Sequence, residues 1–553
     1  MRRTDKIIFF LISAIIITVL WVYQYKISVN IPWWDDFYGI MLPVYNLFTD
    51  IHFIDKIKFF LSLNNEHRVV NDRIFMLLIY LFTGTFEMKT LAMLGYLNLI
   101  GLLAILIKST KGHVINYLYF LPLIFLIFQA QYYESLQSLM VPFQNFSVMF
   151  YVYLSFYFLV FRKRNYIFWA ILFAFFALYS HGNGILAFLI GVIILVFNRR
   201  FSDLKVWLPA GLIAIGLYFW GYQKPEWGPE VSFKDHPLAA FRYVFEFLGA
   251  YFQNITELSS TINRSPVKHL LLEVYGYSLM AVFLVVFGKK YLFPLKIEKL
   301  RNAKTDQFLI VTIGFIFATG LMIGISRTGF PMLSRYTINS TFLSVSVYLF
   351  VLINSKKKKL IASFGITSTF LVLIFSYYDS TENATYNRLN CETDGINWQK
   401  NHTWANQYSD SSHVARLNHL LDEPYARKKY IFPKSKLDNF DQLEVSEFTK
   451  NLNFNITDGV LEISNEVIEN EIPETYFSLE NDNYKFVFPA KNLKNSLTDF
   501  IGSLKYYSGK YRTAFPVKVI PSGEYHIFKI ENKNSQIKKT DTGKLLKTPY
   551  MIY

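Results

Sequence analysis

Long apolar runs constrain this chain more than any other feature of its sequence. Runs of sixteen to twenty mainly apolar residues recur from residue 7 to residue 378 and stop after Tyr377. Each run approaches the roughly 20 residues that an α-helix needs to cross a hydrocarbon core of about 30 Å. With 52% apolar and only 18% charged residues, the chain has more apolar surface than a soluble protein would bury. We therefore expect a polytopic α-helical membrane protein.

Eleven of these runs predict spanning helices, and an odd number of spans places the two chain ends on opposite sides of the membrane. The expected spans lie near residues 7–24, 90–107, 115–133, 145–161, 166–180, 184–198, 205–222, 270–288, 308–326, 337–354 and 360–378. Residues 73–84 are also apolar but number only about twelve. We expect an interfacial or re-entrant helix there, with a true span as the alternative.

The net charge of +15 comes from the apolar part of the chain. Residues 379–553 carry 22 Lys and Arg against 23 Asp and Glu. The excess basic residues cluster at the ends of the predicted helices, for example at Arg2 and Arg3 and at Lys356 to Lys359. This positive-inside pattern predicts a cytoplasmic N-terminus and requires no nucleic acid as a partner. No small-residue cleavage site follows the first run, so we expect an uncleaved helix.

The chain is expected to divide into a transmembrane domain, residues 1–378, and an extracytoplasmic C-terminal domain, residues 379–553. The second part is polar, and short stretches such as 484–488 and 525–530 alternate apolar and polar residues. That pattern predicts a mainly β or α+β domain, with a helical lead-in near residues 412–421. The single cysteine, Cys391, excludes an internal disulfide framework, and no Cys/His cluster predicts a zinc site.

Two adjacent acids, Asp35 and Asp36, follow the first predicted helix on an outward loop. A carboxylate there can deprotonate an incoming hydroxyl, and the pair can hold a divalent cation, Mg or Mn. Adjacent like charges also raise the pKa of one member, which suits a base that works near neutrality. A solvated helix end is an equally weighted alternative.

Glu66, His67 and Arg68 lie later on the same loop and supply an acid, an imidazole and a guanidinium that can bind phosphate. The alternative is a surface patch whose arginine reaches lipid headgroups. Arg335 and Tyr336 follow a proline-containing segment that lacks acids. An arginine without an acidic neighbour predicts another anion as its partner, with headgroup binding of no catalytic consequence as the alternative.

Three further residues are weaker candidates for substrate contacts. His181 lies in a Gly-Asn-Gly turn between two short apolar segments, where a structural role is favoured two to one. Glu134 and Gln144 lie in another outward turn, YYESLQSLMVPFQ. Such side chains suit sugar hydroxyls, but in membrane proteins they are more often packing residues.

The order and spacing of WWDDFY, NNEHRVVNDRI, YYESLQSLMVPFQ, SHGNGI and SRYTINS resemble the GT-C superfamily of polyprenyl-phosphate-sugar-dependent glycosyltransferases. Residues 1–430 are more closely similar to bacterial GT-C-like proteins of surface-polysaccharide synthesis, including O-antigen-modifying glucosyltransferases. The resemblance implies inverting hexosyl transfer on the periplasmic face of the bacterial inner membrane. The donor is then a polyprenyl-phosphate-linked sugar, and the acceptor is a lipid-linked or surface glycan. A flippase and a donor-lipid synthase are implied partners.

By position in the resemblance, Asp35 or Asp36 matches the first-loop acid that serves as base. Arg68, His67, Arg335 and Tyr336 would bind the donor phosphate, and the remaining candidates would contact the sugars: Glu66, Glu134, Gln144 and His181. This chain has two adjacent aspartates where several branches of the family have a spaced acidic pair, so which Asp is the base stays open.

Two other classes of function compete with the transferase. A polysaccharide polymerase, ligase or flippase-type transporter would concentrate charge in its helices or in one large outward loop, whereas the helix interiors here are nearly free of charge. A non-enzymatic membrane scaffold could bind glycan through the C-terminal domain. No Rossmann-like or P-loop motif indicates a nucleotide-dependent mechanism.

Overall fold

The computed structural model describes residues 3–162, 164–223, 233–253, 266–406, 411–449, 451–468, 473–533, 536–548 and 551–552. The chain divides into two compact units. The first, here the helical unit, comprises Met1–Tyr25, Asn46–Phe75 and Leu91–Asp379. The second, here the sandwich unit, comprises Lys26–Tyr45, Met76–Thr90 and Ser380–Tyr553.

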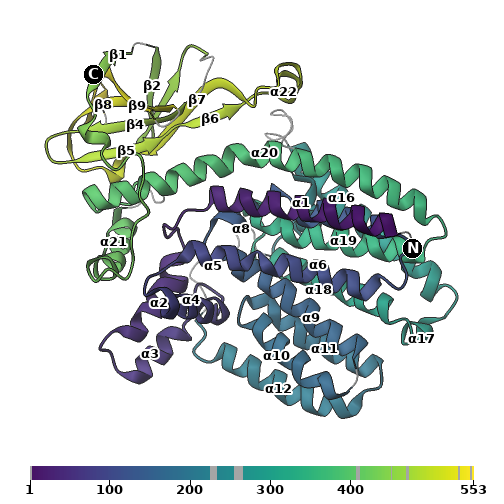
Figure 1. Ribbon diagram of the computed structural model, residues 1–553. Helices are drawn as coiled ribbons and strands as arrows, with labels where there is room; N and C mark the ends of the chain where they lie inside the picture. Colours follow the sequence, from purple (N-terminus) through teal and green to yellow (C-terminus); the bar gives the residue numbers. More distant parts are fainter. Residues whose placement is uncertain are drawn as a thin grey trace. The chain divides into compact units, whose positions relative to one another are not determined.

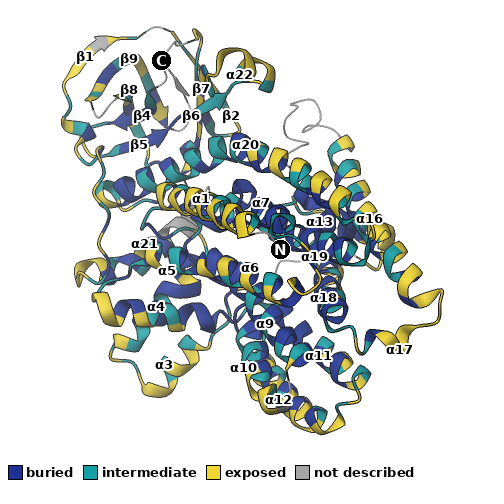
Figure 2. Ribbon diagram, turned by 45° about the vertical axis from the view of Figure 1, so that its right-hand side comes forward, coloured by how far each residue is buried: buried dark blue, intermediate teal, exposed yellow. Residues whose placement is uncertain are grey.

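Eight helical segments in the described residues are long and apolar enough to cross a membrane. They are α1 (Arg3–Ile27), Met88–Thr110 with α5 and α6, Pro142–Phe161 with α9, α12 (Phe201–Phe219), Val267–Leu292 with α16, α18 (Lys304–Ser326), Ser334–Asn354 with α19, and α20 (Lys358–Asn401). Large apolar side chains such as Leu212 and Phe364 are 70% and 75% exposed. Figure 2 shows exposed residues along α1, α12 and α16. These surfaces are compatible with contact to lipid.

Three predicted spans correspond to shorter elements. α10 (Ile167–Leu178) and α11 (Ile185–Phe197) form a helical hairpin whose turn contains His181. Residues 115–133 are not one continuous helix, so the prediction of a single helix there is wrong, while a membrane crossing by this segment stays a prediction: α7 (Leu121–Ile127) begins beside Pro122 and ends before a break at Phe128. Residues 73–84 fall in α4 (Val70–Thr83), a helix of 14 residues. The eleven-span count therefore stays a prediction.

The C-terminal part is a sandwich of two β-sheets (Figure 1). The larger sheet has the order β1-β9-β8-β4-β5, with β10 paired to β9, and the smaller has the order β2-β3-β7-β6. The strands are β1 (Val445–Phe448), β2 (Leu452–Thr457), β3 (Val460–Asn465), β4 (Glu474–Glu480), β5 (Lys485–Pro489), β6 (Lys491–Lys494), β7 (Tyr507–Pro516), β8 (Gly523–Lys533), β9 (Gln536–Thr548) and β10 (Met551–Ile552). The alternating stretches at 484–488 and 525–530 fall in β5 and β8, and the expected helical lead-in is α21 (Ser411–Ala426), which confirms these predictions.

Apolar side chains from both sheets fill the sandwich core. Phe488 of β5 and Phe515 of β7 stack with ring centroids 3.7 Å apart. On the outer face of the larger sheet, Leu389 and Ile396 of α20 pack against Val487 and its neighbours. The second half of α20 is therefore part of the sandwich unit, and a single helix of 44 residues joins an apolar segment to a folded β domain.

Candidate functional site

The candidate site in the helical unit is assembled from loops that join apolar helices. The first is a tight turn at Asn64–His67, closed by backbone hydrogen bonds of 2.8 and 2.9 Å between Asn64 and His67. Asn65 has a left-handed backbone with φ 51°, which Asn tolerates better than most residues. The turn places Glu66 at its tip and His67 at its end.

Glu66 and His67 contact two segments that are distant in sequence. The Glu66 carboxylate forms an ion pair with Arg327, which follows α18. The rings of His67 and His181 are in contact, with centroids 4.0 Å apart and planes tilted by 32°. Three loops thereby meet at one place, although more than 100 residues separate each from the next.

Glycine at position 182 permits this close approach. The backbone N–H of Gly182 donates to Nδ1 of His67 at 3.3 Å. A Cβ atom at this position would lie 3.1 Å from both that nitrogen and the hydroxyl of Tyr218. Tyr218 in turn donates to the backbone carbonyl of Glu66 at 2.8 Å. The Gly-Asn-Gly turn is thus part of the site and not only a connection between helices.

His67 is an uncharged imidazole. Burial, with the positive charges of Arg327 and Arg335 nearby, lowers the pKa of His67 to about 3. Its Nδ1 accepts a hydrogen bond, so the proton lies on Nε2, which is 3.5 Å from Glu66 Oε1. Because the ring is neutral, that contact is not an ion pair. Burial and His67 itself also lower the pKa of His181 well below its ordinary value. Two neutral imidazoles therefore lie beside two guanidinium groups.

Arg335 belongs to a short helical turn, η10 (Ser334–Tyr336), that precedes α19. Its backbone N–H donates to the Glu134 carboxylate at 3.3 Å, and the backbone N–H of Glu134 donates to Ser334 Oγ at 3.2 Å. The Arg335 guanidinium lies 5.9 Å from the Tyr336 ring. Within the described residues it forms no ion pair with a carboxylate. A half-buried guanidinium of this kind can bind an anionic group.

Arg68 and Arg73 have a different role. The three guanidinium nitrogens of Arg68 donate to the carbonyls of Leu61, Tyr218 and Trp220. Arg73 donates to carbonyls at the end of α3 (Phe53–Phe60), at 2.8 Å for Phe60. Both arginines neutralise the carbonyl ends of helices. Phosphate binding by Arg68 therefore has no support from its geometry.

The predicted acids Asp35 and Asp36 lie in the sandwich unit, in the turn before η1 (Phe37–Met41). Asp36 is fully buried, and its carboxylate accepts a hydrogen bond from the Trp33 backbone at 2.9 Å. Asp35 is half-buried. Trp34, directly before Asp35, has a left-handed backbone with φ 51°, an unfavourable conformation for a bulky residue that is characteristic of functional loops.

The described residues contain no group of three or more His, Cys, Asp or Glu that could hold a metal ion. The Asp35 and Asp36 pair supplies at most two carboxylates, and that of Asp36 is already a hydrogen-bond acceptor. Two carboxylates are too few for a Mg or Mn site made of protein ligands alone, so an ion held by them would take its other ligands from water and the substrate phosphate.

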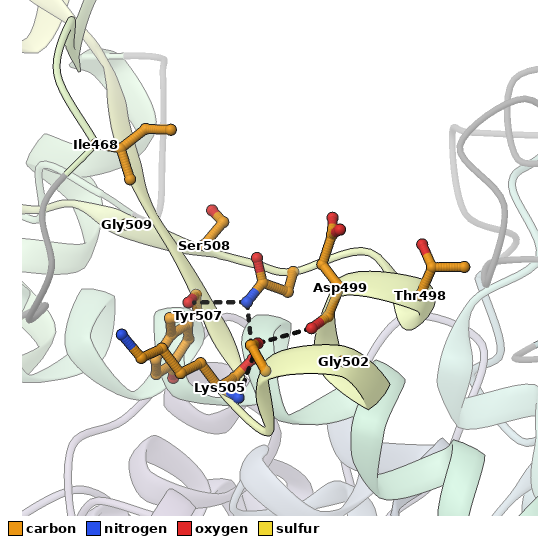
Figure 3. Close-up of a pocket in the computed structure, with 10 residues that line it drawn as sticks. Ile468, Thr498, Asp499, Gly502, Lys505, Tyr507, Ser508 and Gly509 are labelled. Atoms are coloured by element: carbon orange, nitrogen blue, oxygen red, sulfur yellow. Dashed lines mark hydrogen bonds between the residues drawn. The ribbon is translucent and has the colours of Figure 1, made fainter.

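Two other regions lie outside the cluster. Gln144 is buried in the π-helical turn Pro142–Phe146, and within the described residues its side chain makes no hydrogen bond to another candidate. A pocket of about 420 Å³ opens in the sandwich unit, lined by polar residues of α22 (Leu497–Ser503), β7 and their neighbours (Figure 3). None of the residues predicted from sequence lines it.

Arg327 was not among the site residues predicted from the sequence. Its signal was present, since it shares an acid-free segment with Arg335. Tyr218 and Asn183 were also missed. Asn183 bonds Nδ1 of His181 at 2.9 Å and Thr319 of α18 at 3.3 Å. Neither residue carries a sequence signal of its own.

No protein-family model, curated protein or solved structure matches this chain.

Proposed function

We propose that the chain is an inverting glycosyltransferase that moves a sugar from a polyprenyl-phosphate donor to a lipid-linked or cell-surface glycan. The observation that carries the proposal is the convergence of Glu66, His67, His181, Arg327 and Arg335 between apolar helices of one unit. Such a cluster suits an anionic, amphipathic substrate, because the lipid tail stays among apolar helices while the phosphate meets guanidinium groups.

Arg335 is the main phosphate ligand in this proposal, because its guanidinium has no carboxylate partner in the described part of the chain. Arg327 is a second ligand, held in place by Glu66. Because His67 and His181 are neutral, the positive charge of the site lies on the two arginines. The two imidazoles can exchange hydrogen bonds with sugar hydroxyls. In this proposal, Arg327 therefore replaces Arg68 as a ligand of the donor phosphate.

The transfer itself is a single displacement. The acceptor hydroxyl oxygen attacks the anomeric carbon of the donor sugar. The bond between that carbon and the phosphate oxygen breaks, and the lipid phosphate leaves with the electron pair. The acceptor proton passes to a carboxylate base. Of the two first-loop aspartates, we assign this role to Asp35, because it is half-buried while Asp36 is fully buried. Positive charge at Arg335 and Arg327 stabilises the departing phosphate.

The eleven-span arrangement, with a cytoplasmic N-terminus and an extracytoplasmic sandwich, completes the proposal. It places the loops of Glu66, Glu134, His181 and Arg335 on the outward side of a bacterial inner membrane. The donor, made inside and flipped across, is then within reach.

Single substitutions test the assignment of roles, with surface-glycan composition measured by mass spectrometry. Arg335→Ala should lower sugar incorporation by about 100-fold, the usual effect of removing one group that stabilises developing charge. Lys289→Ala, which removes an exposed lysine at a helix end, is the matched control and should leave the glycan unchanged. Unaltered incorporation in Arg335→Ala, at wild-type protein levels, would rule out this residue as the phosphate ligand.

The two aspartates are separated by replacing each with asparagine. Asp35→Asn removes the base and should abolish incorporation. Asp36→Asn keeps an oxygen that accepts the Trp33 N–H, so incorporation should persist. The reverse result would assign the base to Asp36. Full activity in both variants would show that neither aspartate is the catalytic base.

A further inference from the structure

Three basic side chains converge in the helical unit where the turn between α11 and α12 meets the start of α18. Asn198 and Arg200 belong to that turn, and Lys304 is the first residue of α18. Lys304 Nζ donates to Asn198 Oδ1 at 3.1 Å. Arg200 and Arg301 both lie close enough to repel the Lys304 ammonium group. We call Arg200, Arg301 and Lys304 the basic cluster.

Uncharged groups hold Arg301 and Lys304 in position. Arg301 Nε donates at 3.0 Å to the carbonyl of Phe197, the last residue of α11. Asn198, which accepts from Lys304, also exchanges hydrogen bonds of 3.1 and 3.2 Å with the buried side chain of Gln307. The two terminal nitrogens of the Arg301 guanidinium form no hydrogen bond within the described chain. Arg301 therefore has a fork of donors left for a ligand.

The positive charge of the basic cluster is only partly compensated. Arg200 Nε pairs with Asp203 at 2.7 Å. Asp306, the acid in the first turn of α18, pairs with Lys290 instead. In the described part of the chain, the other two members of the cluster pair with no carboxylate. Two half-buried positive charges thus lie side by side, an arrangement that an anion would stabilise.

The first turn of α18 adds to this positive potential. The helix begins after Ala303, and no side chain caps its N-terminus. Free N–H groups and the helix dipole at such an end attract anions. Capping of α11 explains the bond from Arg301 to the Phe197 carbonyl. It does not explain Lys304, because a lysine is unfavourable at the positive end of a helix unless an anion is bound there.

The length of α18 relates the basic cluster to the candidate site. Lys304 begins this helix of 23 residues, and Arg327 directly follows its other end. At 1.5 Å per residue the two positions lie about 35 Å apart. A bilayer has a hydrocarbon core of about 30 Å and spans about 40–45 Å with its headgroups. If α18 crosses the membrane, both of its ends therefore lie at the level of lipid phosphates, in opposite leaflets.

We propose that the basic cluster and the first turn of α18 bind the phosphate group of an anionic phospholipid, in the leaflet opposite to the one at Arg327. The proposal rests on the membrane placement of α18 in the proposed function, and it does not require glycosyl transfer. Arg301 supplies paired donors and Lys304 a compact charge, a combination suited to phosphate oxygens. A soluble phosphate has the same chemistry, but the level of the cluster favours the lipid.

The test labels the full chain in lipid nanodiscs with photoreactive phosphatidylglycerol, and mass spectrometry maps the labelled peptides. One probe carries its photoreactive group in the headgroup and the other deep in an acyl chain. Arg301→Ala removes the fork, and Lys304→Gln removes a charge while it keeps a donor for Asn198. Lys299→Ala is the matched control, since it removes an exposed lysine of the neighbouring α17 (Ile297–Leu300).

The headgroup probe should label residues 197–203 and 299–307 in the wild type. Labelling should fall about tenfold in Arg301→Ala and in Lys304→Gln, as expected for the loss of one charge-assisted hydrogen bond, and should persist in Lys299→Ala. Thermal unfolding in detergent identifies any variant that is not folded. Lys304→Gln, which retains the contact to Asn198, decides the outcome if Arg301→Ala does not fold.

Three results would overturn the proposal, each for a different reason. An equal fall in all three variants would show general attraction of anionic lipid to a basic surface. Loss of labelling in excess inorganic phosphate would assign the site to a soluble phosphate. Absence of acyl-probe labelling on α18 would refute its membrane placement, and the lipid site would fail with it. If the acyl probe labels α18 while the headgroup probe does not label the cluster, the placement stands and the site is wrong.

Discussion

The neutral state of His67 is the residue-scale feature with the clearest energetic consequence. The pKa of His67 lies at about 3 in the folded protein, against an ordinary value of 6.5. Between these values the unfolded chain binds a proton at this residue and the folded chain does not. The contribution of His67 to the free energy of unfolding is therefore fully present above pH 6.5. It is lost as the pH falls toward 3, by at most about 1.4 kcal/mol per pH unit.

We predict that the apparent unfolding temperature in detergent falls between pH 7.5 and pH 5, and that His67→Gln reduces this fall because glutamine does not titrate. His113→Gln, at an exposed histidine, is the control and should retain the wild-type dependence. An equal fall in His67→Gln and the wild type would show that this imidazole is not held neutral by the fold. Intrinsic fluorescence during thermal unfolding provides the measurement.

Arg68 and Arg335 show how far the sequence predicts the roles of individual arginines. Arg68 and Arg335 both occur in polar segments next to apolar helices and were given the same role. Their surroundings differ because Arg68 meets the carbonyls of Tyr218 and Trp220, about 150 residues away, whereas Arg335 has no carboxylate partner in the described residues. Sequence spacing does not reveal such tertiary partners. It therefore identified the candidate residues but not which of them bind phosphate and which bind backbone carbonyls.

At the scale of elements, α20 closes an edge of the larger sheet with side-chain amides. Asn397 bonds both the N–H and the carbonyl of Val487, at 2.8 and 2.9 Å, and Asn401 does the same for Lys485. Strand β5 lies at the edge of its sheet. An open edge strand is a template for aggregation, and these two amides occupy its backbone groups as a neighbouring strand would.

Asn397→Leu should therefore destabilise the sandwich unit, because it leaves two buried backbone groups of Val487 without partners, at about 1–3 kcal/mol each. Gln399→Leu is the matched control on the same helix, since its side chain is exposed and, among the described residues, bonds only Gly395 within α20. Proteolysis of the full chain in detergent reports the difference. Equal resistance of the two variants would contradict the structural role of Asn397.

Helices and strands could be predicted where apolar residues recur with a clear helical or alternating period. The strands at 484–488 and 525–530 and the helix near 412–421 follow from alternation and helical patterning. Segment 115–133 reads as one apolar run, yet a helix that contains Pro122 ends at Phe128, a boundary that hydropathy does not reveal. The extension of α20 to Asn401 was also hidden, because its polar second half is stabilised by packing on the sheet and not by lipid.

At the scale of the whole molecule, the number of spans decides on which side the sandwich lies. Eleven spans place the C-terminus opposite the N-terminus, whereas eight, the number of long apolar helices in the described chain, would place both on one side. We predict that alkaline phosphatase fused after residue 553 is active in a bacterial host and that a fluorescent-protein fusion there is dark. Fusions after Lys359 should give the reverse pattern. A bright fluorescent fusion after residue 553 would contradict the eleven-span arrangement.

Glycosyl transfer is tested most directly by mass spectrometry of the polyprenyl-phosphate-sugar pool together with the surface glycan. Cells that produce the Arg335→Ala protein are compared with cells that produce the wild type, at matched protein levels. The proposed reaction predicts that a polyprenyl-phosphate hexose accumulates in the variant while one sugar disappears from the glycan. An unchanged donor pool and an unchanged glycan, with Arg335→Ala fully inserted in the membrane, would contradict it.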